Sequence, residues 1–429
     1  MERRSDMKSR MKKLKGTARQ LDIEMSKEAV DSVFSEVLED IRRNAKIPGF
    51  RPGKAPMDII QKNYRQDAED EVKQRLIPRG YQMALDEHEI TPVSYPEVSD
   101  VSFELSGTLK FRAKVDSSPD VNLKKYKGYK INKKKVTVTD EEVEETLERI
   151  RNMNAEFSDT DGPIEKGQFG ICNVETFVNG ESVSKEREDM WIEADKESSL
   201  FGMGEELIGL KKGDTKEIEV TLPEKYPDEK YAGKKAIFKV EVKQTKKKEL
   251  PAVDDELAKK MGRETMPEAK EEIKKQLLAR KEANERINMK NQVMETLLKK
   301  HSFEIPSSMV ERQLKVLMEK AENELLQKGV DKANIESHKE KLESQLRKEA
   351  ENKVRLYFIL DEIASAENVE VSDSEVEEWL KRLAASYSQS YDDVKKYYND
   401  NNLISGLKEQ LREEKTLDLL VDEATVTEK

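Results

Sequence analysis

Residues 47–56 read Ile-Pro-Gly-Phe-Arg-Pro-Gly-Lys-Ala-Pro, a stretch that breaks any regular helix. Its two glycines and three prolines enforce a defined, non-helical path. Helical patterns flank it: Ser26–Lys46 combines a capping serine with an apolar stripe, and Met57–His88 predicts one or two further helices. Phe50 has no obvious core to join, because glycine and proline surround it. The stretch is therefore a loop whose aromatic residue either docks on a partner or folds back into a helix–helix corner, and both remain open.

The loop lies in the basic part of an acidic chain. Residues 1–65 contain 16 Lys and Arg against 10 Asp and Glu, a surplus of six, so the rest carries −17 and the whole chain −11. Between residues 42 and 65, seven basic residues are opposed by Asp58 alone. A charge run is usually a solvated face, but around this loop it favours an anionic partner. An exposed Phe50 beside Arg51 and Lys54 suits docking, with the ring in an apolar socket and the cations on phosphates or carboxylates.

Composition limits what the whole chain can be. Its 429 residues suffice for roughly three domains. Charged residues make up 39% and hydrophobic residues 35%, which excludes one large compact core and predicts an elongated, helix-rich or partly disordered chain. No apolar run approaches the ~18–20 residues of a membrane-spanning helix. The net charge alone argues against a simple nucleic-acid binder, which is normally basic. The positive surplus of residues 1–65 reverses that inference for the N-terminal end of the chain.

Cysteine and histidine usage argues against metal and redox chemistry. Cys172 is the single cysteine, so there is no disulfide framework and no thiolate cluster. His88, His301 and His338 are far apart in sequence and are best explained as surface or packing residues. No metal or other cofactor is predicted. Residues 1–20 are basic but lack the apolar stretch of a secretory signal, so a cytoplasmic location is expected.

Motifs of common enzymes are missing. Gly49–Lys54 has three residues between its glycines, and Ala55 stands where a phosphate-binding loop needs Ser or Thr. Gly202-Met203-Gly204 lacks the third glycine of a dinucleotide site, and there is no nucleophile elbow. An ordinary kinase, dehydrogenase or hydrolase is not expected.

Apolar periodicity divides the chain into regions. Residues 1–117 are predicted to mix α and β, with strands over 18–25 and 107–115. Residues 118–157 are an extended linker and a helix that begins at Thr139 in a capping box and ends near residue 157. Residues 158–248 are predicted to be β-rich, and residues 249–429 to be helical, with narrow apolar stripes best explained as bundle core. The predicted fold class is multi-domain α+β and elongated.

The loop resembles the signature of the trigger factor family, the bacterial ribosome-associated chaperones, through Gly49-Phe50-Arg51-x-Gly53-x-x-Pro56. The similarity extends over essentially the whole chain, including Tyr391–Tyr398 and the last four residues. It implies a ribosome-binding N-terminal domain, an FKBP-like middle domain and an all-α C-terminal chaperone domain. It also implies a docking site beside the nascent-chain exit tunnel. The ribosome-binding residues would be Gly49, Phe50, Arg51, Gly53, Lys54 and Pro56, with Phe50 and Arg51 as the main contacts.

One position in the loop departs from the family pattern. Pro52 stands where many members carry a further Lys or Arg. The loop thereby loses a cation and gains rigidity. Ribosome binding is expected to persist but to be weaker.

Residues 158–248 resemble an FKBP-type prolyl isomerase domain through the stretches 209–214, 222–226 and 232–238. Isomerisation needs no nucleophile, because a dry aromatic pocket that favours the twisted amide lowers the barrier of ~18–20 kcal/mol. The resemblance places Tyr226, Phe238 and Met203 at catalytic pocket positions. Met203 stands where an aromatic floor residue is usual, and Met190 where Phe is common.

The expected carboxylate position is also changed, since Val183-Ser184 stands in place of a Phe-Asp-like pair. Methionine adapts to apolar ligands, so peptide binding could survive. Strong isomerase activity is not expected, and whether the chain is an enzyme is left open.

The family resemblance, supported by the partition of charge, leaves two functions open. The first is an ATP-independent chaperone that binds nascent chains at the ribosome and assists folding and export, with a place in protein transport and cell division. The second is a free peptidyl-prolyl isomerase with incidental ribosome contact. An envelope chaperone of similar architecture is disfavoured by the missing signal sequence. Expected partners are the large ribosomal subunit near the exit tunnel, both its protein and its RNA, and nascent or unfolded polypeptides. No membrane partner is expected. Whether the chain forms a homodimer off the ribosome is left open.

The expected client surface is helical and rich in methionine. Six methionines lie between Met261 and Met318, and methionine suits promiscuous surfaces. For any single one of them, filling a gap in the core is the better explanation.

Overall fold

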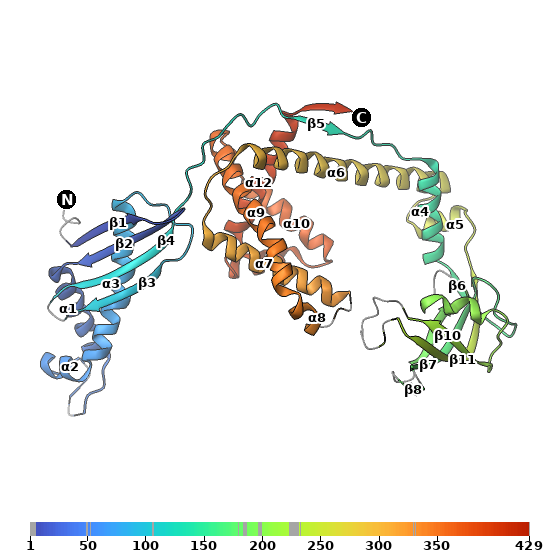
Figure 1. The fold of residues 1–429 in the computed structure, drawn as a ribbon, viewed down its shortest axis with the longest axis horizontal. Helices are drawn as coiled ribbons and strands as arrows, with labels where there is room; N and C mark the ends of the chain where they lie inside the picture. Colours follow the sequence, from blue (N-terminus) through green and yellow to red (C-terminus); the bar gives the residue numbers. More distant parts are fainter. Residues whose placement is uncertain are drawn as a thin grey trace. The chain divides into compact units, whose positions relative to one another are not determined.

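The structure is a computed structural model that describes residues 6–48, 50–51, 53–104, 107–178, 180–182, 187–195, 200–222, 231, 233–328, 330 and 332–428. The chain divides into two compact units, and Figure 1 labels their helices and strands. The first comprises Met1–Ile131, Lys290–Glu322 and His338–Thr425, and the second comprises Asn132–Met289, Asn323–Ser337 and Val426–Lys429. No helix in the described parts is long and apolar enough to cross a membrane.

The first unit opens with an antiparallel sheet in the order β1-β2-β4-β3. Its strands are β1 Met7–Lys13, β2 Ala18–Met25, β3 Glu97–Phe103 and β4 Leu109–Asp116. Three helices accompany it: α1 Lys27–Asn44, α2 Met57–Asn63 and α3 Arg65–Glu87. The α3 helix packs on β1, β2 and β4, and α1 packs on α3. The alternation along β4 points Leu109, Phe111, Ala113 and Val115 into the core beneath these helices.

The remainder of the first unit is mostly helical, apart from residues 117–131, which contain no helix. Its elements are the end of α6 Met266–Lys300, most of α7 Ser307–Gln327, and α9 Lys339–Ala366, α10 Asp373–Ser386, α11 Tyr391–Asp400 and α12 Ile404–Asp422. One apolar cluster joins α7 to α9, and another joins α10, α11 and α12. These clusters are small and separate, as expected for narrow stripes with charged flanks.

The second unit contains a six-stranded sheet in the order β10-β11-β7-β8, with β6 also pairing with β11 and β9 with β7. The strands are β6 Glu156–Thr160, β7 Phe169–Val178, β8 Glu181–Ser182, β9 Arg187–Glu193, β10 Thr215–Thr221 and β11 Lys235–Glu249, and a 3₁₀ helix, η2, spans Leu200–Leu207. The unit also holds α4 Asp140–Met153, α5 Asp255–Lys260, the first part of α6, and α8 Lys332–Ser337. Two short strands, β5 Lys130–Lys133 and β12 Thr425–Glu428, pair with each other.

Several predicted elements are present and others had to be corrected. The strand over residues 18–25 and the capping box at Thr139 are confirmed. The helix that starts there ends at Met153 and not near residue 157, because Phe157 pairs with Lys248 as part of β6. The basic residues 7–13, for which no element was predicted, form the edge strand β1.

Candidate functional site

The loop over residues 47–56 is anchored at its ends and exposed at its tip. Ile47 and Ala55 are buried in the core of the first domain. Between them, Phe50 is 39% exposed, so its ring does not fold back into that core. The Gly53 N–H donates to the Arg42 carbonyl at 3.1 Å, and Gly53 has φ of +78°, a conformation that favours glycine. Pro56 follows as the N-cap residue of α2.

The cations around the loop are only partly neutralised. Arg42 and Arg65 form ion pairs with Glu39 and Glu69 at 2.8 and 2.9 Å. In the part of the chain that the structure describes, Lys46, Arg51, Lys54 and Lys62 form no ion pair and are exposed or partly exposed. The tip therefore presents an aromatic ring beside unpaired positive charges, which suits an anionic partner. Gly49 and Pro52 lie outside the described residues.

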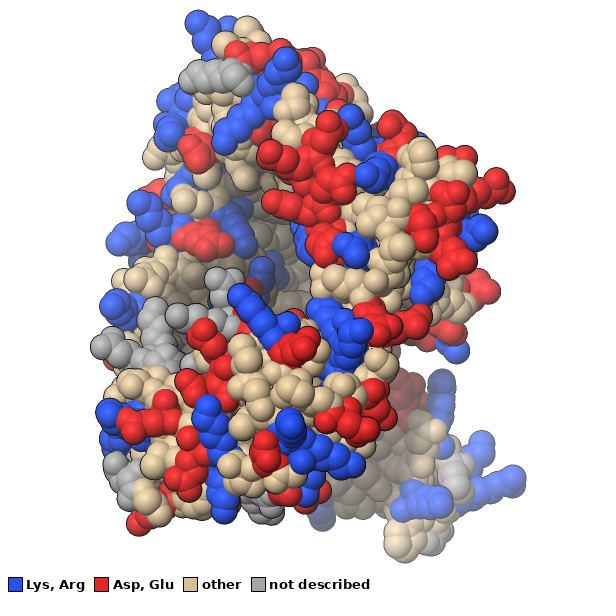
Figure 2. Space-filling model, turned by 90° about the vertical axis from the view of Figure 1, so that its right-hand side faces the viewer, with Lys and Arg blue, Asp and Glu red and all other residues tan. Residues whose placement is uncertain are grey.

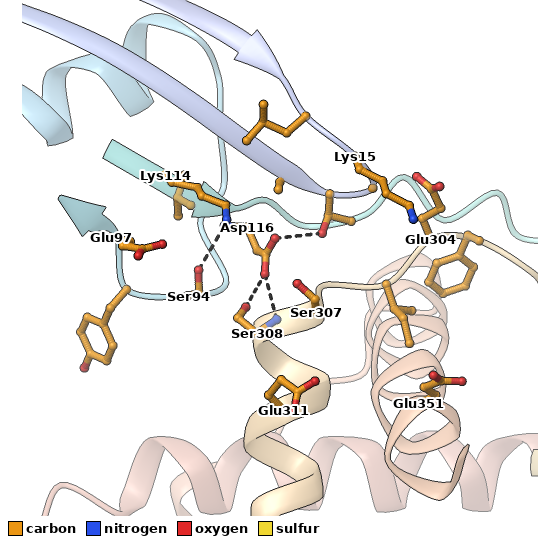
Figure 3. Close-up of a pocket in the computed structure, with 18 of the residues that line it drawn as sticks. Lys15, Ser94, Glu97, Lys114, Asp116, Glu304, Ser307, Ser308, Glu311 and Glu351 are labelled. Carbon is orange, nitrogen blue, oxygen red and sulfur yellow. Dashed lines mark hydrogen bonds between the residues drawn. The ribbon is translucent and has the colours of Figure 1, made fainter. Parts of the chain in front are cut away.

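A second site, which the sequence did not indicate, joins the first sheet to the helices of the same unit (Figure 3). Asp116 ends β4 and is only 7% exposed. Its carboxylate accepts a hydrogen bond from the Ser308 N–H at 3.0 Å and further bonds from the Ser308 and Thr17 hydroxyls. Because Ser308 lies in the first turn of α7, the carboxylate caps that helix from another element.

The cavity around Asp116 has a volume of about 780 Å³. Its charged lining mixes both signs: Lys15 lies beside Glu304, and Lys114 lies on the same side as Glu97 (Figure 3). Arg355, Glu311 and Glu351 complete the charged lining. Such a lining selects no single ligand class. We therefore assign the Asp116 cluster a positioning role, in which it fixes the end of β4 to the start of α7.

His301 is the packing residue that the sequence predicted. It is buried at the end of α6, where its Nε2 accepts the Lys124 N–H at 3.0 Å. Its Nδ1–H can then donate to the Leu297 carbonyl at 2.9 Å. Both ring nitrogens make hydrogen bonds within the protein, so His301 holds Lys124 of the linker against the end of α6.

In the middle domain, the described pocket positions lie in one apolar core. Met203 in η2 and Phe238 in β11 are both buried, and both belong to the cluster that includes Ile192, Leu207 and Val240. Met190 is half-buried against the same cluster. Tyr226 and the Val183-Ser184 pair lie outside the described residues. The structure therefore places Met203 and Phe238 in the same buried apolar cluster.

An aromatic cluster that the sequence did not reveal lies on the same sheet. Phe157 stacks edge-on against Phe169 and Trp191, with ring centroids 5.2 Å apart in both pairs. Lys246 and Lys248 lie over Trp191 and Phe169 at 6.0 and 5.7 Å. These residues come from β6, β7, β9 and β11, so only the strand pairing brings them together. The cluster fastens β6 to the sheet.

The positions of the described methionines favour core packing over an exposed client-binding surface. Met266 and Met289 are buried, and Met309 and Met318 pack partly against the cluster between α7 and α9. Figure 2 shows one face on which acidic and basic side chains alternate in small groups, with no broad area of a single sign. In the described residues, no three His, Cys, Asp or Glu side chains are arranged to hold a metal ion.

Comparison with known families gives matches along most of the chain. Residues 7–150 match the family of bacterial trigger factor proteins, and residues 265–422 match the C-terminal part of the same proteins. Residues 162–243 match the FKBP-type peptidyl-prolyl cis-trans isomerase family.

Curated relatives match over nearly their full lengths. A trigger factor of Geobacillus thermodenitrificans is 34% identical over 432 residues, which covers 98% of this chain and 100% of that protein. A trigger factor of Bacillus pumilus is also 34% identical over 432 residues, with coverage of 97% and 100%. A solved structure, described as promiscuous substrate recognition in folding and assembly activities of the trigger factor chaperone, is 24% identical. It covers 97% of this chain and 99% of that one, with a TM-score of 0.47.

Proposed function

The chain belongs to the trigger factor family of chaperones with an FKBP-type domain, and on that premise we propose that it docks on the large ribosomal subunit beside the exit tunnel. There it holds nascent chains without ATP and assists their folding and export. This role places the chain in the cytoplasm. The proposed domains are residues 1–117 for ribosome binding, 118–157 as linker and helix, 158–248 as the isomerase-like domain and 249–429 as the chaperone domain.

One observation carries the docking proposal. The loop tip presents Phe50 at 39% exposure between buried anchors, and Arg51 and Lys54 beside it have no described carboxylate partner. A half-exposed ring with flanking cations is the arrangement of a contact that buries an aromatic residue and neutralises phosphates. The proposed contact residues are Gly49, Phe50, Arg51, Gly53, Lys54 and Pro56.

Co-sedimentation with ribosomes tests this proposal. We expect the Phe50→Ala, Arg51→Ala double variant to lose most of its binding, because it removes both the apolar anchor and a phosphate contact. The matched control is Tyr95→Ala, Lys114→Ala, which removes an aromatic residue that is 96% exposed and an exposed cation of the same domain outside the loop. Equal sedimentation of the double variant and the parent chain would overturn the proposal.

A salt series separates this function from incidental contact. Phosphate-directed binding falls steeply as salt is raised, since each neutralised phosphate releases counterions. We expect binding of the parent chain to follow that dependence and the double variant to show a smaller slope. A salt-independent residual binding of both proteins would favour the free isomerase as the main function.

We propose that the middle domain contributes little isomerase activity. In support, Met203 provides a flexible thioether at the floor position, and both Met203 and Phe238 are buried in the domain core. A proline-containing tetrapeptide assay with the full chain tests this proposal. We expect the uncatalysed time constant of roughly 10–100 s at 25 °C to change little, and robust catalysis would contradict the proposal.

A further inference from the structure

A groove of about 600 Å³ runs between α4 and α6 in the second unit, with part of its wall from α5. On α4 it is lined by Thr146, Arg149, Ile150 and Met153, which are three or four residues apart and so share one helix face. On α6 the lining runs from Ala269 to Arg280 with the same spacing. Those eleven steps of about 1.5 Å make the groove roughly 16 Å long.

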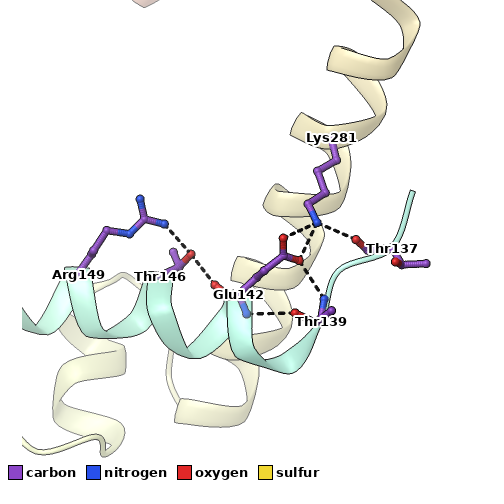
Figure 4. Close-up of polar contacts among 6 residues, drawn as sticks. All are labelled: Thr137, Thr139, Glu142, Thr146, Arg149 and Lys281. Atoms are coloured by element: carbon purple, nitrogen blue, oxygen red, sulfur yellow. Dashed lines mark hydrogen bonds and ion pairs between the residues drawn. The ribbon is translucent and has the colours of Figure 1, made fainter. Parts of the chain in front are cut away.

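The two helices that form the groove are held together at one end (Figure 4). Lys281 of α6 donates to the Glu142 carboxylate at 2.5 and 2.7 Å and to the Thr137 carbonyl at 2.8 Å. Hydrogen bonding to Lys281, together with the backbone of Thr139, lowers the pKa of Glu142 and so favours the ionised carboxylate that pairs with Lys281. The groove is therefore a preformed feature of this helix pair.

The floor of the groove is apolar and adaptable. Ile273 is buried there, and Ile150, Met261 and Leu277 are half-buried. Met153 is 85% exposed in the lining, although its side chain is apolar. Unbranched methionine side chains can adjust to ligands of different shape. The exposed parts of Ile150, Met153 and Leu277 thus offer apolar surface that is not covered within the described part of the unit.

The rim of the groove is basic in a chain that is acidic overall. The lining contains four cations, Arg149, Lys260, Arg263 and Arg280, against the single carboxylate of Glu272. Arg263 is neutralised by Glu272 at 3.1 Å, and Lys260 lies 3.5 Å from Glu156. Within the described residues, Arg149 and Arg280 form no ion pair. They lie on opposite helices, so unpaired positive charge flanks the apolar floor on both sides.

We propose that this groove binds an amphipathic helix of a partner polypeptide, with apolar residues on one face and Asp or Glu along its borders. The length of the groove matches about three helical turns, whereas an extended peptide would place only about five residues along it. Apolar anchors three or four residues apart would fill the floor, and flanking carboxylates would pair with Arg149 and Arg280. The site goes beyond ribosome docking and does not depend on it.

Site-specific fluorescence on the full chain tests the proposal. Asn152→Cys places a thiol on the exposed side of α4 beside Met153. The native Cys172 is buried, and burial raises the pKa of its thiol to about 12, so an environment-sensitive dye labels position 152 selectively. The probe is a synthetic amphipathic peptide of about 18 residues, long enough to form a helix, with Leu on one face and Glu along its borders. The matched peptide carries Lys in place of every Glu.

We expect the acidic peptide to change the dye signal and saturate it, and the basic peptide to bind at least about tenfold more weakly. Arg149→Glu, Arg280→Glu should weaken the acidic peptide at least about fivefold, because it replaces attraction by repulsion. The control Lys259→Glu, Lys275→Glu makes the same charge change at exposed positions outside the groove and should stay within about twofold of the parent. Equal binding of the two peptides by the parent chain, or equal loss in both double variants, would overturn the proposal.

Discussion

At the scale of single residues, Asp116 links the first sheet to the helical region of the same unit. Its backbone belongs to β4, and its carboxylate accepts hydrogen bonds from the first turn of α7. The Asp116 N–H is itself bonded to the Ser94 hydroxyl at 3.1 Å. A buried carboxylate with three donors is stable only while those donors stay in place. Asp116 therefore determines how firmly α7 is held.

Asp116→Ala should loosen the start of α7 without unfolding the sheet. Loss of hydrogen bonds to a charged group costs about 1.5–3 kcal/mol, which is roughly a 10-fold to 150-fold increase in amide exchange. Native-state hydrogen exchange measures this directly at Ser308 and its neighbours. Ser308→Ala, which keeps the bond from the backbone N–H, should give a smaller change. Unchanged protection of α7 in Asp116→Ala would show that the helix is held by packing alone.

The sequence revealed the loop residues but not Asp116. Phe50 and its neighbours stood out because two glycines and three prolines lie within nine positions of the chain. They leave the Phe50 ring without a local core. Asp116 and Ser308 are 192 positions apart. The chain has 89 acidic residues, and nothing near Asp116 in the sequence distinguishes it from the others. The Phe157, Phe169 and Trp191 cluster was missed for the same reason, since strand pairing assembles it.

At the scale of elements, the close packing of α3 on the sheet depends on a glycine. A Cβ atom at Gly80 would lie 2.7 Å from the Met25 sulfur and 3.3 Å from the Phe111 ring. Both neighbours are buried and belong to β2 and β4. The α3 backbone can approach the sheet this closely because residue 80 has no side chain.

Gly80→Val should destabilise the chain although valine has a higher helix propensity than glycine. Overpacking of this contact costs roughly 1–3 kcal/mol. The control is Gly406→Ala in α12, where a Cβ would meet no atom within 4 Å, so the substitution should stabilise by up to about 1 kcal/mol. Urea titration of both variants checks the opposite signs. A stabilised Gly80→Val variant would mean that α3 does not pack closely on the sheet.

The start of α10 depends on a carboxylate with a strongly lowered pKa. Hydrogen bonding to Lys415, and then to the backbone and hydroxyl of Ser372, lowers the pKa of Glu375 to about 2. Because the folded pKa is below the unfolded value, the contribution of Glu375 to stability is present above about pH 4.5. It is lost as the pH falls toward 2.

Lys415→Met should move the pKa of Glu375 back toward its ordinary value of 4.5, since the largest cause of the shift is removed. The capping box with Ser372 would remain and hold the pKa somewhat low. Carbon-13 NMR titration of the Glu375 carboxyl group measures both proteins. Coincident titration curves would show that the Lys415 contact does not persist in solution.

Elements with strong local signals were predictable, and elements made by tertiary pairing were not. The capping serine and apolar stripe at Ser26 and the capping box at Thr139 predicted the starts of α1 and α4. The strands β1, β6 and β9 are charged and mostly exposed. They have no clean alternation of apolar residues, and pairing with β2, β11 and β7 creates them.

At the scale of the whole molecule, charge is divided unevenly along the chain. The first 65 residues carry a surplus of six positive charges, and the remainder carries −17. A basic tip is drawn to phosphates, while an acidic remainder is repelled by the same surface. The chain should therefore engage the ribosome through its loop and keep its chaperone region free for clients.

Photo-crosslinking from the loop tests that central claim most directly. A photoreactive phenylalanine analogue at position 50 keeps the aromatic ring, and the same analogue at position 95 replaces Tyr95, which is 96% exposed in the same domain. We predict that the chain with the analogue at position 50 crosslinks to components of the large ribosomal subunit, and that the chain with the analogue at position 95 does not. Crosslinks from position 95 in the absence of any from position 50 would contradict the account.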